Sequence, residues 1–168
     1  MTDTSPSDQD AGEQRVTYPD QWVVLGEHTV EEFFQERQWR PDGTWTPEPG
    51  LIAEIVRPLH TVLQGRLDQL IERVSVLRFP FINEPRHASE YFVQCVEIIR
   101  AGRRLVFLNG FHRRAMDSPR AGDKWQTSPH RVCDGGPWHF RAEYDPATHQ
   151  IVKLRFNGPY STLNPSRD

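Results

Sequence analysis

The chain has 168 residues, 36% of them hydrophobic, and a formal net charge of −3, which suits one loop-rich domain with a core rather than two domains. No apolar run approaches the roughly 20 residues that a membrane-spanning helix needs, and the N-terminus, MTDTSPSDQDAGEQ, is too acidic and polar for a secretory signal. We therefore expect a soluble, cytoplasmic protein without a membrane partner.

The expected organisation is a single domain between two tails. Residues 1–17 lack periodicity and large apolar side chains, so they are predicted to be a disordered acidic tail. The domain is expected to span residues 18–160, and residues 161–168 to form a loose C-terminal tail.

The first elements expected in the domain are short. Trp22–Leu25 is an apolar run that fits an edge strand or a docking segment. Thr29 and Glu32 have the spacing of a capping box, so a helix is predicted to begin at Val30 and to end near Gln38. A turn-rich connector follows, and the two tryptophans that flank its first turn, Trp39 and Trp45, are expected to cover an edge of the core.

The main helix is predicted over Leu51–Val76. Its apolar residues recur at steps of three and four, as on a helix with one face against a core. Pro58 predicts a kink or a division into two helices, because proline removes a backbone donor. Gly65 predicts a close approach of the helix to a sheet.

Glu90–His112 is predicted to be the central hairpin. Both alternating faces of its two runs are rich in aromatic and β-branched residues, and Gly102 supplies the turn between them. A strand that is apolar on both faces is covered on both. The exceptions are interpreted as rim positions or as groups that face a partner: Gln94, Glu97, Asn109 and Gly110.

A second hairpin is predicted from Trp138 to Phe156. Its alternation gives one buried face, which includes Val152, and one wet face, on which Glu143 lies near Lys153. The expected fold class is α+β: a long amphipathic helix packed on a four-stranded antiparallel meander. In strand order and length this layout looks like the cystatin-like or nuclear-transport-factor-like topology over about residues 51–158. The resemblance rests on no motif and implies no function.

Charge is segregated along the chain. Residues 1–54 contain three arginines against twelve acidic residues, a net charge of −9, whereas residues 100–131 have a net charge of +6. Between the two hairpins lies an aperiodic loop of eighteen residues, which is long for a compact domain. The leading hypothesis is a non-catalytic module that binds another macromolecule, with protein favoured as partner, through this basic loop at one end of the sheet. The proposed binding residues are His112, Arg113, Arg114, Arg120, Lys124, Trp125 and Arg131.

A second hypothesis is an enzyme or metal protein that uses a His/Cys cluster at the base of the loop. Imidazole and thiolate side chains suit zinc, and the candidate ligands are His112, His130, Cys133 and His139. Alternatively, Cys133 is a nucleophile with His130 or His112 as base and Asp134 as the group that orients it. The competing structural interpretation is a small buried thiol beside a turn.

A third hypothesis is a nucleic-acid-binding protein. The cations of the loop and Trp125 could contact phosphates and stack on a base, but the pI of about 6.2 is far from that of a typical nucleic-acid binder. No phosphate-binding glycine loop and no cofactor motif is found in the sequence, so no cofactor is expected. The oligomeric state is not indicated.

Overall fold

The computed structural model describes residues 20–35, 39–76, 85–117, 123–132 and 135–158. It has the expected α+β architecture, whereas the two predicted tails lie outside the described residues. The helices and strands are β1 (Trp22–Val24), α1 (Val30–Phe34), α2 (Leu51–Val76), β2 (Tyr91–Arg100), β3 (Arg103–His112), β4 (His139–Asp145) and β5 (Gln150–Phe156). No helix within these ranges has both the length and the apolar character that a membrane crossing requires.

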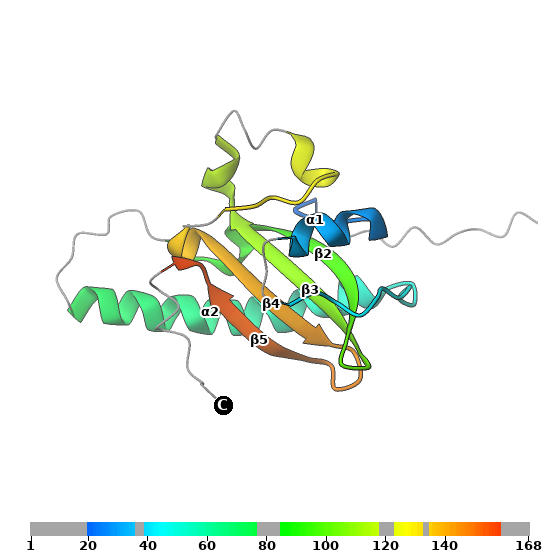
Figure 1. Cartoon of the computed structure of the whole chain (residues 1–168). Coiled ribbons are helices and arrows are strands. Elements are labelled where there is room, and N and C mark those ends of the chain that lie inside the picture. Colours follow the sequence, from blue (N-terminus) through cyan, green and yellow to red (C-terminus); the bar gives the residue numbers. More distant parts are fainter. Residues whose placement is uncertain (1–19, 36–38, 77–84, 118–122, 133–134, 159–168) are drawn as a thin grey trace, which may run out of the picture.

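The sheet has five strands in the order β1-β2-β3-β4-β5 and is mixed (Figure 1). The meander from β2 to β5 is antiparallel, as predicted. The predicted sheet of four strands did not include β1, so the expected strand count is wrong. This strand lies at the edge and pairs with β2 in parallel, with Trp22 opposite Val93. A parallel pair needs a long connection between its strands, and here both helices lie in that connection.

The β2–β3 hairpin is confirmed and is tighter than predicted. Its register runs from Tyr91 opposite His112 to Arg100 opposite Arg103, so the turn has two residues. Both adopt positive φ, 50° at Ala101 and 72° at Gly102. Positive φ at both central residues matches the right-handed twist of the flanking strands.

Two separate cores cover the two faces of this hairpin. On one face, which we call the helix face, α2 packs through residues that include Ile55, Leu59 and Leu63 against the sheet. On the other face, which we call the loop face, α1 packs through Phe33 and Phe34 against β2 and β3. The prediction that the central strands are covered on both sides is therefore confirmed.

Three details of the helices differ from the predictions. The helix α2 runs unbroken through Pro58, so the predicted division into two helices is wrong, while a kink at Pro58 stays a prediction. At Gly65 an added Cβ would meet nothing within 4 Å, so the expected close approach to the sheet is wrong. The helix α1 begins at Val30 as predicted, but the Thr29 hydroxyl donates to the Gly26 carbonyl oxygen (2.8 Å) and makes no helix cap.

The β4–β5 hairpin contains a β-bulge that the alternation of the sequence does not reveal. The register shifts between Glu143 and Tyr144, which pair with Lys153 and Ile151. Val152 is the extra residue and is 44% exposed, so its predicted burial is wrong. A bulge of this kind reverses the facing of every residue beyond it, and Ile151 packs against the core instead.

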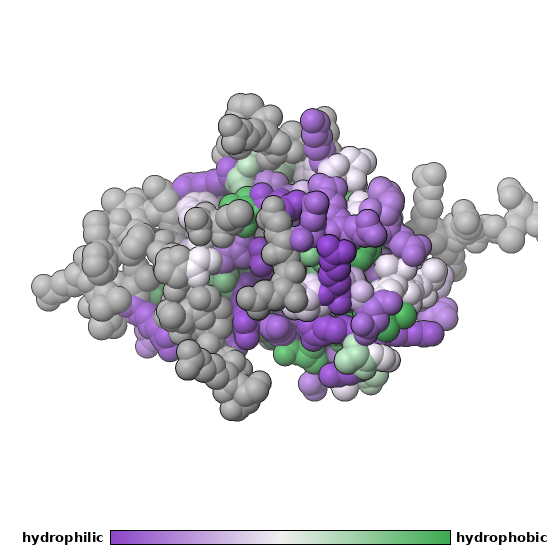
Figure 2. Space-filling model, viewed as in Figure 1, coloured by the Kyte–Doolittle hydropathy of each residue, from purple (hydrophilic) through white to green (hydrophobic). Residues whose placement is uncertain are grey.

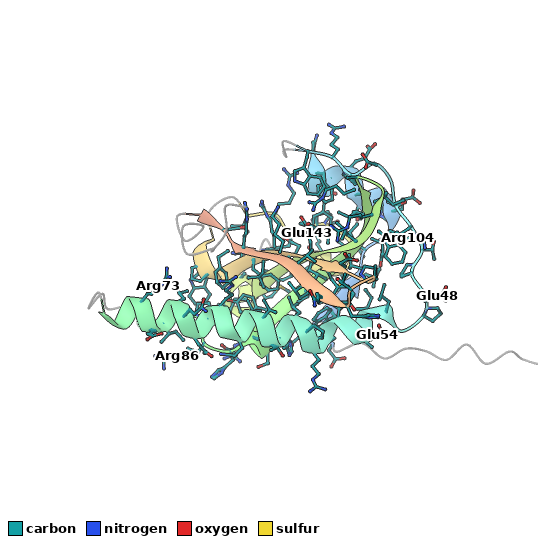
Figure 3. The ribbon with its side chains drawn as sticks, turned by 90° about the horizontal axis from the view of Figure 1, so that it is seen from below. Glu48, Glu54, Arg73, Arg86, Arg104 and Glu143 are labelled. Atoms are coloured by element: carbon teal, nitrogen blue, oxygen red, sulfur yellow. The ribbon has the colours of Figure 1, made fainter. Side chains whose placement is uncertain are left out.

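Charged residues form an ion-paired layer on the loop face, where a wet surface was expected. The Arg100 guanidinium binds both carboxylate oxygens of Glu143, at 2.7 and 2.5 Å, and Arg103 pairs with Asp145. Lys153 lies 3.8 Å from Glu143, as predicted. Figure 3 shows Glu143 on the side of the sheet away from α2. Both carboxylates are buried, so these pairs belong to the core of the loop face.

Gly110 gives the fold a sharp test. The ring of Phe140 on β4 lies across Gly110, and an alanine Cβ there would be 1.9 Å from its Cε1 atom. We predict that Gly110→Ala lowers the free energy of unfolding by about 2–3 kcal/mol, as overpacked core substitutions do. Gly65→Ala, in the exposed part of α2, should instead raise it by up to about 1 kcal/mol. Urea denaturation of both variants checks the pair, and equal effects would contradict the packing described.

Candidate functional site

The basic loop is held on the loop face by a clamp of two buried amides. The Gln94 side chain donates from Nε2 to the carbonyl oxygens of Trp125 (2.5 Å) and Ser128 (2.8 Å). Its Oε1 accepts from Asn109 Nδ2 (3.0 Å) and from the backbone N–H of His130 (2.8 Å), and Asn109 also donates to the His130 carbonyl oxygen. Gln94 and Asn109 are therefore buried anchors of the loop rather than rim positions.

The aromatic side chains of the loop complete this cover. Trp125 is 6% exposed and meets Phe92 and Phe111 edge-on, at centroid distances of 5.0 and 5.9 Å. The His130 ring packs on Phe111 at 4.3 Å. The predicted binding residue Trp125 is thus a core side chain. Its burial stabilises the loop, since it removes a large apolar area from water.

His112 lies on the helix face, away from the loop surface where it was expected. It is 3% exposed, its Nε2 is 3.3 Å from Glu90 Oε2, and its Nδ1 accepts the backbone N–H of Arg114 at 3.2 Å. Burial lowers the pKa of His112, while Glu90 opposes this change. Both ring nitrogens of His112 are engaged and its side chain is buried, so the ring is not exposed at the surface of the loop; its predicted role as a base stays a prediction, because Cys133 lies outside the described residues.

His130 and His139 meet on the loop face. Their rings are nearly parallel (7°) with centroids 5.5 Å apart, and their Nε2 atoms are separated by 3.4 Å. Burial lowers the pKa of both, that of His139 to about 4, to which the proximity of His130 contributes. Both rings are therefore neutral at pH 7, when one Nε2 can donate a hydrogen bond to the other.

The predicted His/Cys cluster is brought together only in part. His130 and His139 lie together, His112 faces the opposite side of the sheet, and Cys133 and Asp134 lie outside the described residues. Among the residues that are described, no group of three or more His, Cys, Asp or Glu side chains is arranged to hold a metal ion. The thiol hypothesis stays a prediction.

Cations of the loop and of strands β4 and β5 lie at exposed or half-buried positions, and we call them together the basic surface. The His130 carbonyl oxygen accepts a hydrogen bond from Asn109 on β3. In the register of the sheet, Arg141 on β4 lies opposite Asn109, and Arg155 on β5 lies opposite Arg141. The loop cations thus continue onto the outer strands, and strongly hydrophilic side chains gather on this face in Figure 2. Predicted residue Arg120 lies outside the described ranges. The basic surface consists of Arg113, Arg114, Lys124, Arg131, Arg141, Lys153 and Arg155.

Two members of the basic surface have fixed positions at the end of the sheet. Arg113 binds Glu90 Oε1 at 2.9 Å with 64% of its side chain exposed. The guanidinium of Arg114 lies over the ring of Trp138, 5.6 Å from its centroid. Stacking and pairing of this kind orient an arginine without removing its outer donors from solvent.

A second site-like feature lies at Glu97, which was interpreted as a rim or partner-facing group. Glu97 is 8% exposed and lines a pocket of about 420 Å³ beside the sheet edge. Its Oε1 is buried and has no hydrogen-bond partner among the described residues. The signal in the sequence was a single carboxylate in the middle of an apolar strand, VQCVEIIR, but the strand pattern does not show which segments surround it.

No protein-family model, no curated protein and no solved structure matches this chain. The cystatin-like or nuclear-transport-factor-like topology therefore stays a prediction.

The clamp can be tested by removing the Gln94 amide. In Gln94→Leu, two carbonyl oxygens, the His130 N–H and the Asn109 amide lose their shared partner in contacts that are buried or partly buried. We predict a loss of about 2–4 kcal/mol in the free energy of unfolding, since each unsatisfied buried group costs about 1–3 kcal/mol. The matched control is Gln126→Leu at an exposed position of the same loop, which should change stability by less than about 0.5 kcal/mol. A similar small effect at Gln94 would contradict the clamp.

Proposed function

We propose that this protein is a non-catalytic module that binds an acidic protein through its basic surface. The observation that carries the proposal is that one part of the loop is buried against the sheet while its cationic side chains are exposed. Its backbone and aromatic rings are buried against the sheet, while the Lys124 side chain and its arginines lie at the exposed side. A rigidly backed, cation-rich surface lowers the entropy cost of binding a partner of opposite charge.

The shape of the surface supports one kind of partner. Exposed cations extend from Arg114 across the loop to Arg155 on the outermost strand. Such a spread matches a broad acidic surface rather than a single anion. Lys153 is also oriented by Glu143, which preorganises this part of the surface.

A protein fits the site better than a nucleic acid does. Base recognition on single strands relies on aromatic rings that stack with bases. Trp125, which could have supplied such a ring, is covered by the contact with Phe92 and Phe111. The remaining attraction is electrostatic, and acidic side chains satisfy it without stacking.

The experiment is affinity capture from a lysate of the organism that encodes the chain. The test variant carries Arg114→Glu, Lys124→Glu and Arg155→Glu, and the matched control carries Arg57→Glu, Arg73→Glu and Arg86→Glu, which are exposed positions outside the basic surface. Quantitative mass spectrometry of the captured proteins should show an acidic partner with wild type and control. With the test variant, capture should fall at least about tenfold, because charge complementarity governs association.

Two outcomes would contradict the proposal. One is equal capture by the test variant when both variants melt like the wild type. The other is capture that disappears after nuclease treatment, which would assign the basic surface to nucleic acid instead.

A further inference from the structure

The pocket at Glu97 lies along the edge of β2 that pairs with β1, where two segments of the chain separate. On one side of Glu97, the Leu25 N–H donates to the Cys95 carbonyl oxygen at 2.9 Å; on the other, the Ile99 N–H donates to the Gly43 carbonyl oxygen at 2.8 Å. Between these two attachment points the chain after β1 and the connector before α2 diverge. The pocket is lined by Val24, Leu25, Gly26, Glu27, Thr44, Trp45, Thr46, Pro47, Glu48, Ile52, Val96 and Glu97.

Glu97 is the buried polar group of this pocket. It lies on the helix face opposite Val106, and burial raises its pKa, while its own backbone amide acts in the opposite direction. Its Oε1 has no donor among the described residues. A buried carboxylate oxygen without a donor costs more than a paired one, so Glu97 Oε1 is an acceptor beside the pocket whose hydrogen-bonding capacity is unused.

The other lining groups favour a positively charged occupant. Two further carboxylates, Glu27 and Glu48, lie at exposed positions of the lining, and none of the lining residues is lysine or arginine. Glu48 lies at the end of the sheet where α2 begins, as does Arg104 (Figure 3). The Arg104 guanidinium is held over the Trp45 ring at 5.6 Å from its centroid and is not part of the lining.

Apolar and aromatic groups form the rest of the wall. Trp45 donates from Nε1 to the Leu105 carbonyl oxygen at 3.1 Å, which fixes the plane of its ring, and Ile52 is buried beside it. The volume of about 420 Å³ falls within the range of small-molecule sites, roughly 300–1,000 Å³. The pocket therefore offers a ligand one buried carboxyl group, that of Glu97, beside the apolar side chains of Trp45 and Ile52.

We propose that this pocket binds a small organic cation, a protonated primary amine with a short apolar body. The ammonium group donates hydrogen bonds to Glu97 Oε1, and the carbon skeleton packs against Trp45 and Ile52. The rim carboxylates raise the local concentration of the cation by long-range attraction. This site is separate from the basic surface and does not depend on the function proposed for it.

The proposal carries a defined pH dependence. The charged and titratable groups around Glu97 are Glu27 and Glu48 in the lining, Arg104 above Trp45, and Cys95 on the same strand, whose pKa is raised by burial. Because burial raises the pKa of Glu97 above its ordinary value, this carboxyl group keeps its proton to a higher pH than an exposed glutamate does. The bound ammonium requires the ionised form, so binding releases that proton. Affinity rises with pH until the amine itself deprotonates near its own pKa of about 10.

Isothermal titration calorimetry with 2-phenylethylamine and n-hexylamine tests the proposal, with 2-phenylethanol and n-hexanol as neutral counterparts. Wild type should bind an amine with a dissociation constant in the millimolar range or below, and bind the matching alcohol at least about tenfold more weakly. Glu97→Gln should weaken amine binding at least about tenfold, since the charge-assisted hydrogen bonds are lost. Glu31→Gln, an exposed carboxylate of α1 outside the lining, should leave the affinity unchanged.

Folding of the variants does not limit the test. A carboxyl group with a raised folded-state pKa contributes full stability below its unfolded pKa and loses it as pH rises. Glu97→Gln removes this loss, so its melting temperature at pH 7 should equal or exceed that of wild type. Glu48→Gln, at an exposed position, offers a second variant and should weaken amine binding severalfold.

Three results would overturn the proposal: no heat of binding with either amine, equal affinity for amine and alcohol, or amine affinity that neither Glu97→Gln nor Glu48→Gln changes.

Discussion

The fold depends on one constraint: the β2–β3 hairpin is apolar on both faces, so the chain has to supply two covers. The helix α2 covers the helix face as a single long element. No second long helix covers the loop face in the described part of the chain, and there the cover is assembled from pieces. The helix α1 lies over the hairpin end, and the loop around Trp125 and His130 lies over the opposite end. Hydrophobic burial alone would not fix an irregular loop in place.

Polar side chains inside the hairpin provide that fixation and explain where the two proposed sites lie. Gln94 and Asn109 place their amides under the loop and satisfy its backbone groups, which leaves the cations of the loop at the surface. Glu143 and Asp145 are buried on the same face but are paired with Arg100 and Arg103. Glu97, on the helix face, differs because one of its oxygens has no partner among the described residues. The buried side chains that have hydrogen-bond or ion-pair partners hold the fold together. Glu97, whose Oε1 has no such partner among the described residues, lines the pocket instead.

Sequence patterns within single segments predicted much of this fold, whereas the pairings between distant segments could not be predicted from them. The hairpin at Gly102 and the helix Leu51–Val76 follow from periodicity within one segment. The parallel pairing of β1 with β2 joins residues about seventy positions apart, and nothing in Trp22–Leu25 specifies it. The bulge that exposes Val152 depends on the partner strand as well. Gln94 was recognisable as an exception in an apolar strand, but its partners lie some thirty residues downstream, so rim and clamp could not be told apart. The basic loop was predicted from charge, whereas its continuation to Arg141, Lys153 and Arg155 and the burial of Trp125 and His112 needed the register of the sheet.

The backbone N–H of His130 tests the central claim most directly, because it donates to Gln94 Oε1 from a segment outside any helix or strand. Hydrogen exchange of this amide can be followed by NMR and compared with the amides of β3. If the clamp and the aromatic cover hold the loop, releasing His130 also exposes Phe92 and Phe111, and its protection should approach that of the central strands. Exchange at the rate of an unstructured peptide would contradict the claim that the loop is the second cover of the hairpin.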